Sequence, residues 1–332
     1  MRAMALAKQG FIATRPLAPV ELLDAEPGPH EIRVRVAACG VCRTDLHVIE
    51  GDLPPHRTPL VPGHQVVGRV DAVGEGASRF AVGDRVGIAW LRGTCGRCDA
   101  CRRGDENLCP YSTFTGWDAD GGYAELAVVP EAYAYSIPER FEDAAATPLL
   151  CAGIIGYRAL TRSRVPDGGR LGLYGFGSSA HVVIQIARAR GCEVYVATRD
   201  AAHRKLAEEL GATWTGGTLD VPPVPLDGAI VFAPAGEVVP PALASLRPGG
   251  TVAVAGIHLT DVPPLSYAGH LFQEKTLTSV TANTRADGEA LLAEAARIGL
   301  KPRVTTFPLA EANDALIALS EDRVSGTAVL VP

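Results

Sequence analysis

Two groups of side chains in this sequence have residue types and spacings that could hold metal ions. The first is Cys95, Cys98, Cys101 and Cys109, spaced C-x2-C-x2-C-x7-C in a loop rich in Gly, Arg and Asp. Four thiolates from one loop can surround a tetrahedral zinc ion at about 2.3 Å. Because zinc has no redox chemistry of its own, we expect an ion here to support the local fold.

Two other kinds of cysteine site fit this loop less well. Pro110 after the last cysteine suggests an iron–sulfur cluster, but the bacterial ferredoxin pattern has about three residues before that cysteine, and this loop has seven. A zinc ribbon for nucleic acid needs two separated Cys-x2-Cys pairs and basic surroundings, and neither is present. The spacing therefore favours structural zinc.

The second group of candidate ligands is spread along the chain. The segment CGVCRTDLH, from Cys39 to His47, contains thiol, hydroxyl, carboxylate and imidazole groups; His64 follows in PGHQ, and Cys151 lies far downstream in an apolar stretch. Two thiolates and one imidazole, with one open coordination position, are a known ligand set for catalytic zinc. Taken singly, however, a cysteine in an apolar stretch is more often a buried small hydrophobic residue.

A glycine-rich turn is a candidate nucleotide site. It consists of Gly175, Phe176, Gly177, Ser178, Ser179 and Ala180. The turn follows a predicted strand and begins a predicted helix, so its backbone can approach a pyrophosphate at the helix N-terminus.

The residues after the next predicted strand bear on the choice of cofactor. Where an acid would bind the ribose of NAD, the chain has Thr198 and Arg199. A hydroxyl and a guanidinium can hold the 2′-phosphate of NADP, with His203 and Arg204 assisting. Asp200 follows directly, and Arg199 could instead pack on the adenine of NAD. We expect NADP to be preferred.

The rest of the sequence predicts the domains that position these groups. Up to about Pro130 it consists of short strand-like segments broken by glycine, which indicates a mainly β domain. From about Asp143 strands alternate with helices of about 10 to 15 residues, which indicates an α/β domain with a doubly wound parallel sheet. The last fifty or so residues could extend that sheet or return to the first domain.

Length, charge and composition narrow the function classes. A chain of 332 residues suggests two domains, and a net charge of -6 makes nucleic acid a poor partner. No run approaches the ~18 apolar residues of a membrane span, and no signal peptide is recognised, so we expect a cytoplasmic protein. Eight cysteines, four of them in one loop, suit metal binding better than disulfides.

Several motifs together resemble the zinc-containing medium-chain alcohol dehydrogenases. They are CGVCRTDLH, PGHQVVG, VGDRVG, the four-cysteine loop, DGGYAELAVV, LLCAGIIGYRAL and GFGSSA, and they cover essentially the whole chain. The bacterial and plant-type members look most similar. The resemblance implies a GroES-like catalytic domain at 1–150 with a zinc lobe at about 92–112, a Rossmann domain at 151–284, and a C-terminal return to the catalytic domain at 285–332.

The implied reaction is reversible hydride transfer between a primary or secondary alcohol and NAD or NADP. The resemblance implies that Cys42, His64 and Cys151 bind a catalytic zinc, the second zinc of the chain, while Cys39 is no ligand. Asp45 would then orient the ligand histidine. Thr44 would hydrogen-bond the alcohol oxygen, and the proton would pass through the cofactor ribose to His47.

Other implied roles concern the cofactor and the substrate. Further cofactor contacts are expected from Arg43, Ala255 and Ile257, and a substrate pocket wall from Trp90 and Trp117, although either tryptophan could be core packing. Three positions depart from the family pattern: Gln65, Ile155 and Thr327 replace Glu, Thr and Arg.

The resemblance leaves several functional alternatives open. Family members suggest a homodimer or homotetramer with a small alcohol or aldehyde as substrate. One alternative is an aldehyde reductase, for long-chain or aromatic aldehydes. Another is a cofactor-binding relative that has lost catalysis.

Overall fold

The structure, a computed structural model, describes residues 1–54, 56–256, 258–324 and 326–332. The chain divides into two compact units. Unit 1 comprises Met1–Cys151, Thr284–Ala296 and Lys301–Pro332, and unit 2 comprises Ala152–Asn283 and Arg297–Leu300. The chain therefore leaves unit 1 after Cys151 and returns to it at Thr284.

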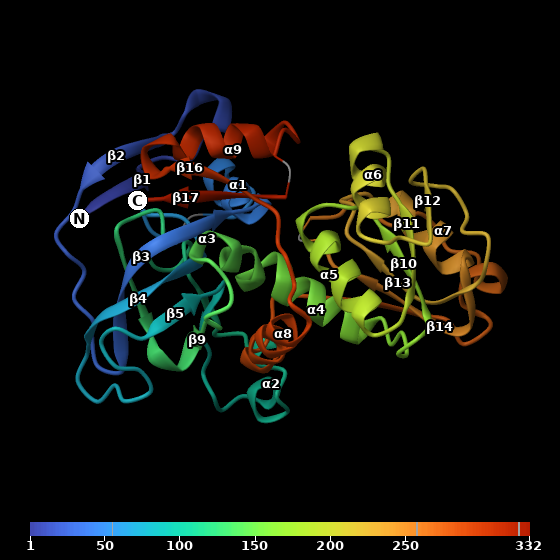
Figure 1. The fold of residues 1–332 in the computed structure, drawn as a ribbon, viewed down its shortest axis with the longest axis horizontal. Helices are drawn as coiled ribbons and strands as arrows, with labels where there is room; N and C mark the ends of the chain where they lie inside the picture. Colours follow the sequence, from blue (N-terminus) through green and yellow to red (C-terminus); the bar gives the residue numbers. More distant parts are fainter. Residues whose placement is uncertain (55, 257, 325) are drawn as a thin grey trace. The chain divides into compact units, whose positions relative to one another are not determined.

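Unit 1 is built on a seven-stranded sheet of order β16-β17-β3-β4-β5-β9, with β8 also paired to β3. Figure 1 shows the C-terminal strand β17, in red, beside β3, in blue. The strands are β3 (Glu31–Val41), β4 (Gln65–Val73), β5 (Arg85–Ile88), β8 (Leu126–Pro130), β9 (Ala134–Ser136), β16 (Val304–Pro308) and β17 (Thr327–Val331). In β3 the apolar residues alternate with polar ones over EIRVRV, as in a strand with one face on the core.

Short hairpins and helices complete unit 1. The hairpins pair β1 (Arg2–Leu6) with β2 (Leu17–Glu21), and β6 (Leu91–Gly93) with β7 (Thr113–Phe114). The helices are α1 (Arg43–Glu50), α2 (Asp99–Arg102), α3 (Asp143–Ala146), α8 (Arg285–Ile298, whose end passes into unit 2) and α9 (Ala312–Ser320). Single turns are η1 (Ile12–Thr14), η2 (Glu106–Leu108), η3 (Glu131–Tyr133), η4 (Thr147–Leu150) and η7 (Leu309–Glu311).

Unit 2 contains the six-stranded sheet β12-β11-β10-β13-β14-β15, in which every neighbouring pair is parallel. Its strands are β10 (Arg170–Tyr174), β11 (Glu193–Ala197), β12 (Trp214–Gly216), β13 (Leu226–Val231), β14 (Leu246–Val254) and β15 (Thr276–Ser279). Its helices are α4 (Ala152–Arg162), α5 (Ser178–Ala189), α6 (Ala201–Glu209) and α7 (Val239–Ala244), with short turns η5 (Gly236–Val238) and η6 (Tyr267–Leu271).

This strand order is that of a doubly wound Rossmann sheet, so the predicted α/β fold class is confirmed. The central strands β10 and β13 are buried over most of their length: Leu171, Leu173 and Ile230 have no exposed surface. Burial on both faces explains why these strands are short apolar runs without alternation. The three-residue strand β12 is too short to give a sequence signal of its own.

Within the described residues, no single helix is long and apolar enough to cross a membrane. One bent pair, Asp143–Leu150 with Ala152–Arg162, passes that test by length and composition.

Candidate functional site

The fold brings Cys42, His64 and Cys151 together in unit 1. In the β3–β4 pair Gly40 lies opposite Gln65, so Cys42 just after β3 lies close to His64 just before β4. The Sγ atom of Cys42 is 3.3 Å from His64 Nε2 and 3.9 Å from Cys151 Sγ. One ligand atom from each residue lies within 4.8 Å of the others. Three separate segments thus converge on one point.

Asp45 connects two of these residues. Its Oδ2 accepts a hydrogen bond from the backbone N–H of Cys42 at 2.8 Å, and its Oδ1 lies 3.1 Å from His64 Nδ1. The first contact is half of a capping box, in which the Cys42 sulfur caps the start of α1. Asp45 is 2% exposed and His64 is fully buried. Since Asp45 accepts the Nδ1 proton, Nε2 is the ring nitrogen that faces the sulfur atom of Cys42.

Without metal, the surroundings of Cys42 and His64 favour the protonated forms of both side chains. Burial opposes the charged form of His64, but the Cys42 sulfur and the Asp45 carboxylate raise its pKa to about 10. A hydrogen bond with Cys151 and burial raise the pKa of the Cys42 thiol well above its ordinary value. A divalent cation would displace these protons and satisfy the sulfur and nitrogen donors together, so the donor set fits zinc.

Gln65, one of the departures from the family pattern, adds an unusual group beside this cluster. It is fully buried, and neither its Oε1 nor its Nε2 has a hydrogen-bond partner among the described residues. A Cβ atom on Gly40 would lie 3.0 Å from the Gln65 carboxamide carbon, so glycine is what allows the amide to fit. Gln65 brings no negative charge to the site.

The proposed relay residues lie on the first turns of α1. Thr44 is 8% exposed, and His47 lies three residues further on, which places both on one helix face. His47 Nδ1 is 2.7 Å from Asp52 Oδ2, and the Asp52 side chain is 60% exposed. The helix therefore leads from a buried hydroxyl to an imidazole with a solvated carboxylate beside it.

An aromatic wall extends from His64. Trp90 meets the His64 ring edge-on, with centroids 4.9 Å apart, and stacks on Trp117 at 5.9 Å and on Phe114 at 5.0 Å. Trp117 in turn stacks on the exposed His56 at 4.2 Å. Trp90 and Trp117, singled out from the sequence, thus belong to one stack that begins at a candidate metal ligand.

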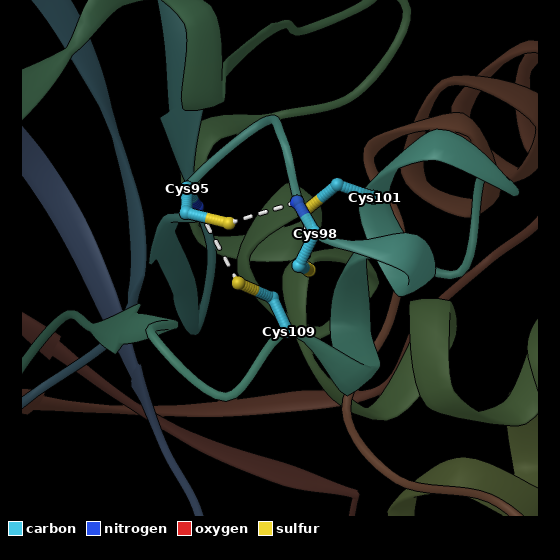
Figure 2. Close-up of side chains that lie close together, drawn as sticks. All are labelled: Cys95, Cys98, Cys101 and Cys109. Atoms are coloured by element: carbon cyan, nitrogen blue, oxygen red, sulfur yellow. Dashed lines mark hydrogen bonds between the residues drawn. The ribbon is translucent and has the colours of Figure 1, made fainter.

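The four-cysteine loop also has the geometry of a metal site. One sulfur from each of Cys95, Cys98, Cys101 and Cys109 lies within 4.8 Å of the others, and Figure 2 shows the four side chains facing a common space. Sulfur atoms bound tetrahedrally at about 2.3 Å would be about 3.8 Å apart. Backbone N–H groups of residues 98 and 95 donate to Cys95 Sγ and Cys109 Sγ. Hydrogen bonds from the backbone N–H groups of Arg97 and Cys98 lower the pKa of Cys95 to about 6, which favours the thiolate form that a metal needs.

The glycine-rich turn of unit 2 has the backbone that a phosphate site requires. Gly175 has φ +90, and a Cβ atom there would lie 2.8 Å from the backbone N of Ala233. Gly177 caps α5, and a Cβ there would meet nothing within 4 Å. The first glycine is therefore needed by the fold, whereas the second keeps the space at the helix N-terminus open. Ala180 is fully buried, Phe176 is 2% exposed, and Ser178 and Ser179 are half-buried.

The residues that follow β11 determine which charged side chains lie near the predicted ribose site. Thr198 is 4% exposed, and the Arg199 side chain is exposed. Asp200 Oδ1 accepts hydrogen bonds from the backbone N–H of residues 202 and 203, so this carboxylate caps α6. These bonds lower the pKa of Asp200. Arg204 donates to the carbonyl oxygens of Thr198 and Arg199 and fixes the loop.

The other residues singled out from the sequence lie as follows. Arg43 forms an ion pair with Asp322 at 2.6 Å. Ala255 donates its N–H to Val231 O, directly after β14. Ile257 lies outside the described residues. Ile155 is half-buried in α4, and Thr327 is 3% exposed in β17.

Sequence reasoning missed four residues around the site: Asp52, His56, Phe114 and Asp118. His56 Nδ1 is 2.5 Å from Asp118 Oδ1, and the other oxygen of Asp118 accepts the N–H of Phe114. Only Phe114 and Asp118 carried a signal, since they flank Trp117 in the sequence. The partners of Asp52 and His56 follow from loop folding, which has no periodicity to detect.

Comparisons with known proteins agree with this geometry. The model of the alcohol dehydrogenase GroES-like domain matches residues 28–139, and that of zinc-binding dehydrogenases matches 180–297. The chain is 55% identical to the Mycobacterium tuberculosis protein named "Probable alcohol dehydrogenase AdhA" (100% of this chain, 97% of the relative) and 35% identical to a Geobacillus stearothermophilus alcohol dehydrogenase (90% and 91%). A cinnamyl alcohol dehydrogenase structure from Sorghum bicolor superposes with TM-score 0.90 at 29% identity, covering 99% and 97% of the two chains.

Proposed function

This chain belongs to the zinc-type medium-chain alcohol dehydrogenases, and on that premise we propose that it interconverts an alcohol and an aldehyde or ketone with NADP as its preferred cofactor. The hydride leaves the alcohol carbon for the nicotinamide ring, the hydroxyl loses a proton, and the carbon becomes a carbonyl. The observation that carries the proposal is the convergence of Cys42, His64 and Cys151 beside Thr44.

Three residues would hold the catalytic ion. Cys42 and Cys151 offer sulfur atoms, and His64 offers Nε2 because Asp45 lies against Nδ1. A zinc ion bound there would supply Lewis acidity toward the substrate oxygen through its open position. The four-cysteine loop would hold a second, structural ion, since a loop that supplies four thiolates leaves no position open.

The proton is proposed to leave along α1. The Thr44 hydroxyl can accept the proton of the substrate hydroxyl while donating its own onward, which a hydroxyl does without a net change in charge. His47 is the first titratable group further along this face, and Asp52 would orient its ring. Thr44 and His47 would be bridged by the ribose of a bound cofactor, so that the proton could reach solvent without exposing the buried site to water.

The preference for NADP rests on where the charges after β11 lie. Asp200, the acid nearest to Arg199 in the sequence, is turned to the N-terminus of α6 and bonded to two backbone amides. Asp200 is therefore bound to the start of α6, and the Arg199 side chain lies at the surface. A 2′-phosphate would gain charge-assisted hydrogen bonds from Arg199 and the Thr198 hydroxyl.

The aromatic wall supports planar, aromatic substrates. Trp90, Phe114 and Trp117 form a stack that begins at His64, so a ring attached to the reacting carbon could lie along it. The Sorghum bicolor relative is named as an enzyme of cinnamyl alcohol, which agrees with this substrate class. Reduction of aromatic aldehydes with NADPH is the direction we propose to test first.

The experiment combines metal content with turnover. We expect two zinc ions per chain and faster oxidation of NADPH than of NADH with benzaldehyde. Cys151→Ala should lose turnover and one zinc, whereas Cys192→Ala, a buried cysteine outside both clusters, should keep both. Retained NADPH binding with no turnover on any alcohol or aldehyde would instead support a binding protein that has lost catalysis.

Cofactor preference is tested by a matched pair of variants. Arg199→Leu should raise the KM for NADPH with little effect on that for NADH. Lys205→Leu removes an exposed positive charge from α6 without reaching the loop and should change neither. An equal effect of Arg199→Leu on both cofactors would overturn the assignment.

We also propose that the protein forms a homodimer or homotetramer. The mass of the protein in solution would test this.

A further inference from the structure

The four-cysteine loop contacts a distant part of unit 1 through one carboxylate. Glu106 lies between Cys101 and Cys109, and its side chain is 10% exposed. Its oxygens accept three kinds of hydrogen bond from Arg285: from the backbone N at 2.8 Å, from Nε at 3.0 Å and from Nη2 at 2.6 Å. Arg285 is 179 positions further along the chain and is the first residue of α8.

The beginning of the loop reaches the same arginine. The Arg285 guanidinium lies over the ring of Tyr133, 4.7 Å from its centroid. The hydroxyl of Tyr133 is 2.8 Å from Oγ1 of Thr94, the residue before Cys95. Arg285 is therefore bound by Glu106, three residues before the last cysteine of the loop. Through Tyr133 it also contacts Thr94, the residue before the first cysteine.

Arg285 also marks the point where the chain returns to unit 1. Unit 2 ends its longer segment at Asn283, and Thr284 begins the next segment of unit 1. The Thr284 N–H donates to Asp287 Oδ2 at 2.8 Å, and the Asp287 N–H donates to Thr284 Oγ1 at 3.1 Å. This reciprocal cap fixes the start of α8, and the loop fixes its first side chain.

The loop cannot hold Glu106 in place by secondary structure alone. Its regular elements are the four-residue α2 and the three-residue η2, which are far shorter than a helix that is stable by itself. Four thiolates around one ion would supply the missing constraint, because each metal–sulfur bond fixes one position of the loop. If Glu106 lost its position, its hydrogen bonds to Arg285 would break; the Glu106 side chain is 10% exposed and that of Arg285 is 40% exposed, so the cost falls mainly on the carboxylate.

We propose that metal binding by the four-cysteine loop and the anchoring of α8 are thermodynamically coupled, with Glu106 and Arg285 as the positioning residues that connect them. The inference rests on the loop holding a metal ion, as proposed above. Coupling of this kind is reciprocal: metal stabilises the first turn of α8 against opening, and the ion pair strengthens metal binding by the same free energy. A loss of affinity is expected to show mainly as faster metal release. The loop would thus secure the return of the chain to unit 1.

The effect of the loop metal on the start of α8 is tested by hydrogen exchange of the peptide that covers residues 284–290. The measurement uses the full-length protein with its zinc bound. Cys109→Ser removes one loop ligand and should lower zinc content by one ion and speed exchange of this peptide by about tenfold, equivalent to about 1.4 kcal/mol. Glu106→Gln should speed it similarly. The double variant should exchange no faster than the faster single variant, because both changes break one connection.

Release of zinc to a chromogenic chelator tests the effect of the ion pair on metal binding. Glu106→Gln should release the loop zinc about tenfold faster than the unaltered protein. Asp105→Asn is the matched control, because it removes the neighbouring carboxylate. Asp105 and its ion-pair partner Arg103 are both exposed, so this variant should change neither the rate of zinc release nor the rate of hydrogen exchange. If Cys109→Ser is insoluble, chelation of the unaltered protein gives the metal-free arm, and Arg285→Lys replaces the forked contacts with a single one.

The outcomes separate the two hypotheses. If Cys109→Ser holds as much zinc as the unaltered protein, the proposed loop metal is wrong. If it loses one ion while the exchange of 284–290 is unchanged, the metal is there but the coupling is refuted. Equal zinc release from Glu106→Gln and Asp105→Asn would also overturn the coupling.

Discussion

Asp45→Asn should weaken metal binding by the Cys42, His64 and Cys151 set without unfolding the chain. Asp45 uses its two oxygens for two donors, the His64 Nδ1–H and the Cys42 backbone N–H. An asparagine has the same shape but only one acceptor oxygen. Whichever way the amide is turned, its NH2 group faces one of the two donors. If it faces His64, Nε2 is no longer held as the acceptor that a metal needs.

The magnitude follows from the role of Asp45 and its burial. Loss of a carboxylate that orients a ligand histidine typically lowers metal affinity by about 10- to 100-fold, which is about 1.4 to 2.8 kcal/mol. Partial loss of the cap on α1 adds a cost of about 1 kcal/mol to the metal-free fold. Because Asp45 is 2% exposed, solvent cannot satisfy the donor that is left without a partner.

Competition with a chelator of known zinc affinity measures the first quantity, and thermal unfolding of metal-free protein measures the second. Asp314→Asn is the matched control, since Asp314 is also an acid in the first turn of a helix, α9, but pairs with the exposed Arg15. We expect the control to change neither metal content nor turnover. An Asp45→Asn variant that binds zinc as tightly as the unaltered protein would refute the reasoning that Asp45 prepares His64 for the metal.

Other perturbations give contrasting results. Gly177→Ala should raise the KM for cofactor at unchanged Tm, because its Cβ enters open space, whereas Gly175→Ala should lower Tm, because its Cβ meets backbone; equal effects on Tm would contradict this. Trp117→Ala should raise the KM for benzaldehyde about tenfold and that for a short aliphatic aldehyde little; a uniform change would remove Trp117 from the substrate wall. Since the pKa of His64 is about 10 without metal, zinc must displace protons, and zinc affinity should rise with pH; a pH-independent affinity would contradict this. The ion pair with Arg285 lowers the pKa of Glu106 despite its burial, so its stabilisation should be complete above the ordinary carboxyl pKa and lost as pH falls through the lowered value. The difference in Tm between the unaltered protein and Glu106→Gln should therefore vanish in acid.

The fold class was predictable because each half of the chain has its own periodicity. The alternation of strands and helices after Asp143 predicted the Rossmann sheet, and the structure confirms it. The secondary structure of the segment from Cys39 to His47 was harder to predict, because its polar residues were noted for their chemistry and gave no helical pattern. In the structure it ends β3 and begins α1, with the Cys42 sulfur as the cap.

The sequence predicted where the cofactor-binding loops lie between strands and helices, but it did not predict which partners their side chains contact. GFGSSA predicts a turn between strand and helix because only glycine adopts the φ that Gly175 has. Asp200 caps α6; an aspartate directly before a helix is a typical N-cap, a signal that our prediction for this residue did not use. Arg43 is found in an ion pair with Asp322, a residue 279 positions away.

The sequence by itself determined which side chains could bind metal and which elements carry them, since ligand type, local spacing and periodicity are properties of short segments. The family resemblance implied that Cys151 joins Cys42 and His64, but only the tertiary structure shows how they meet, that Asp45 serves two partners, and that Glu106 reaches Arg285. The reason is physical: these contacts depend on strand register and chain return over 19 to 179 positions, where closing the loop costs entropy that only the assembled core offsets.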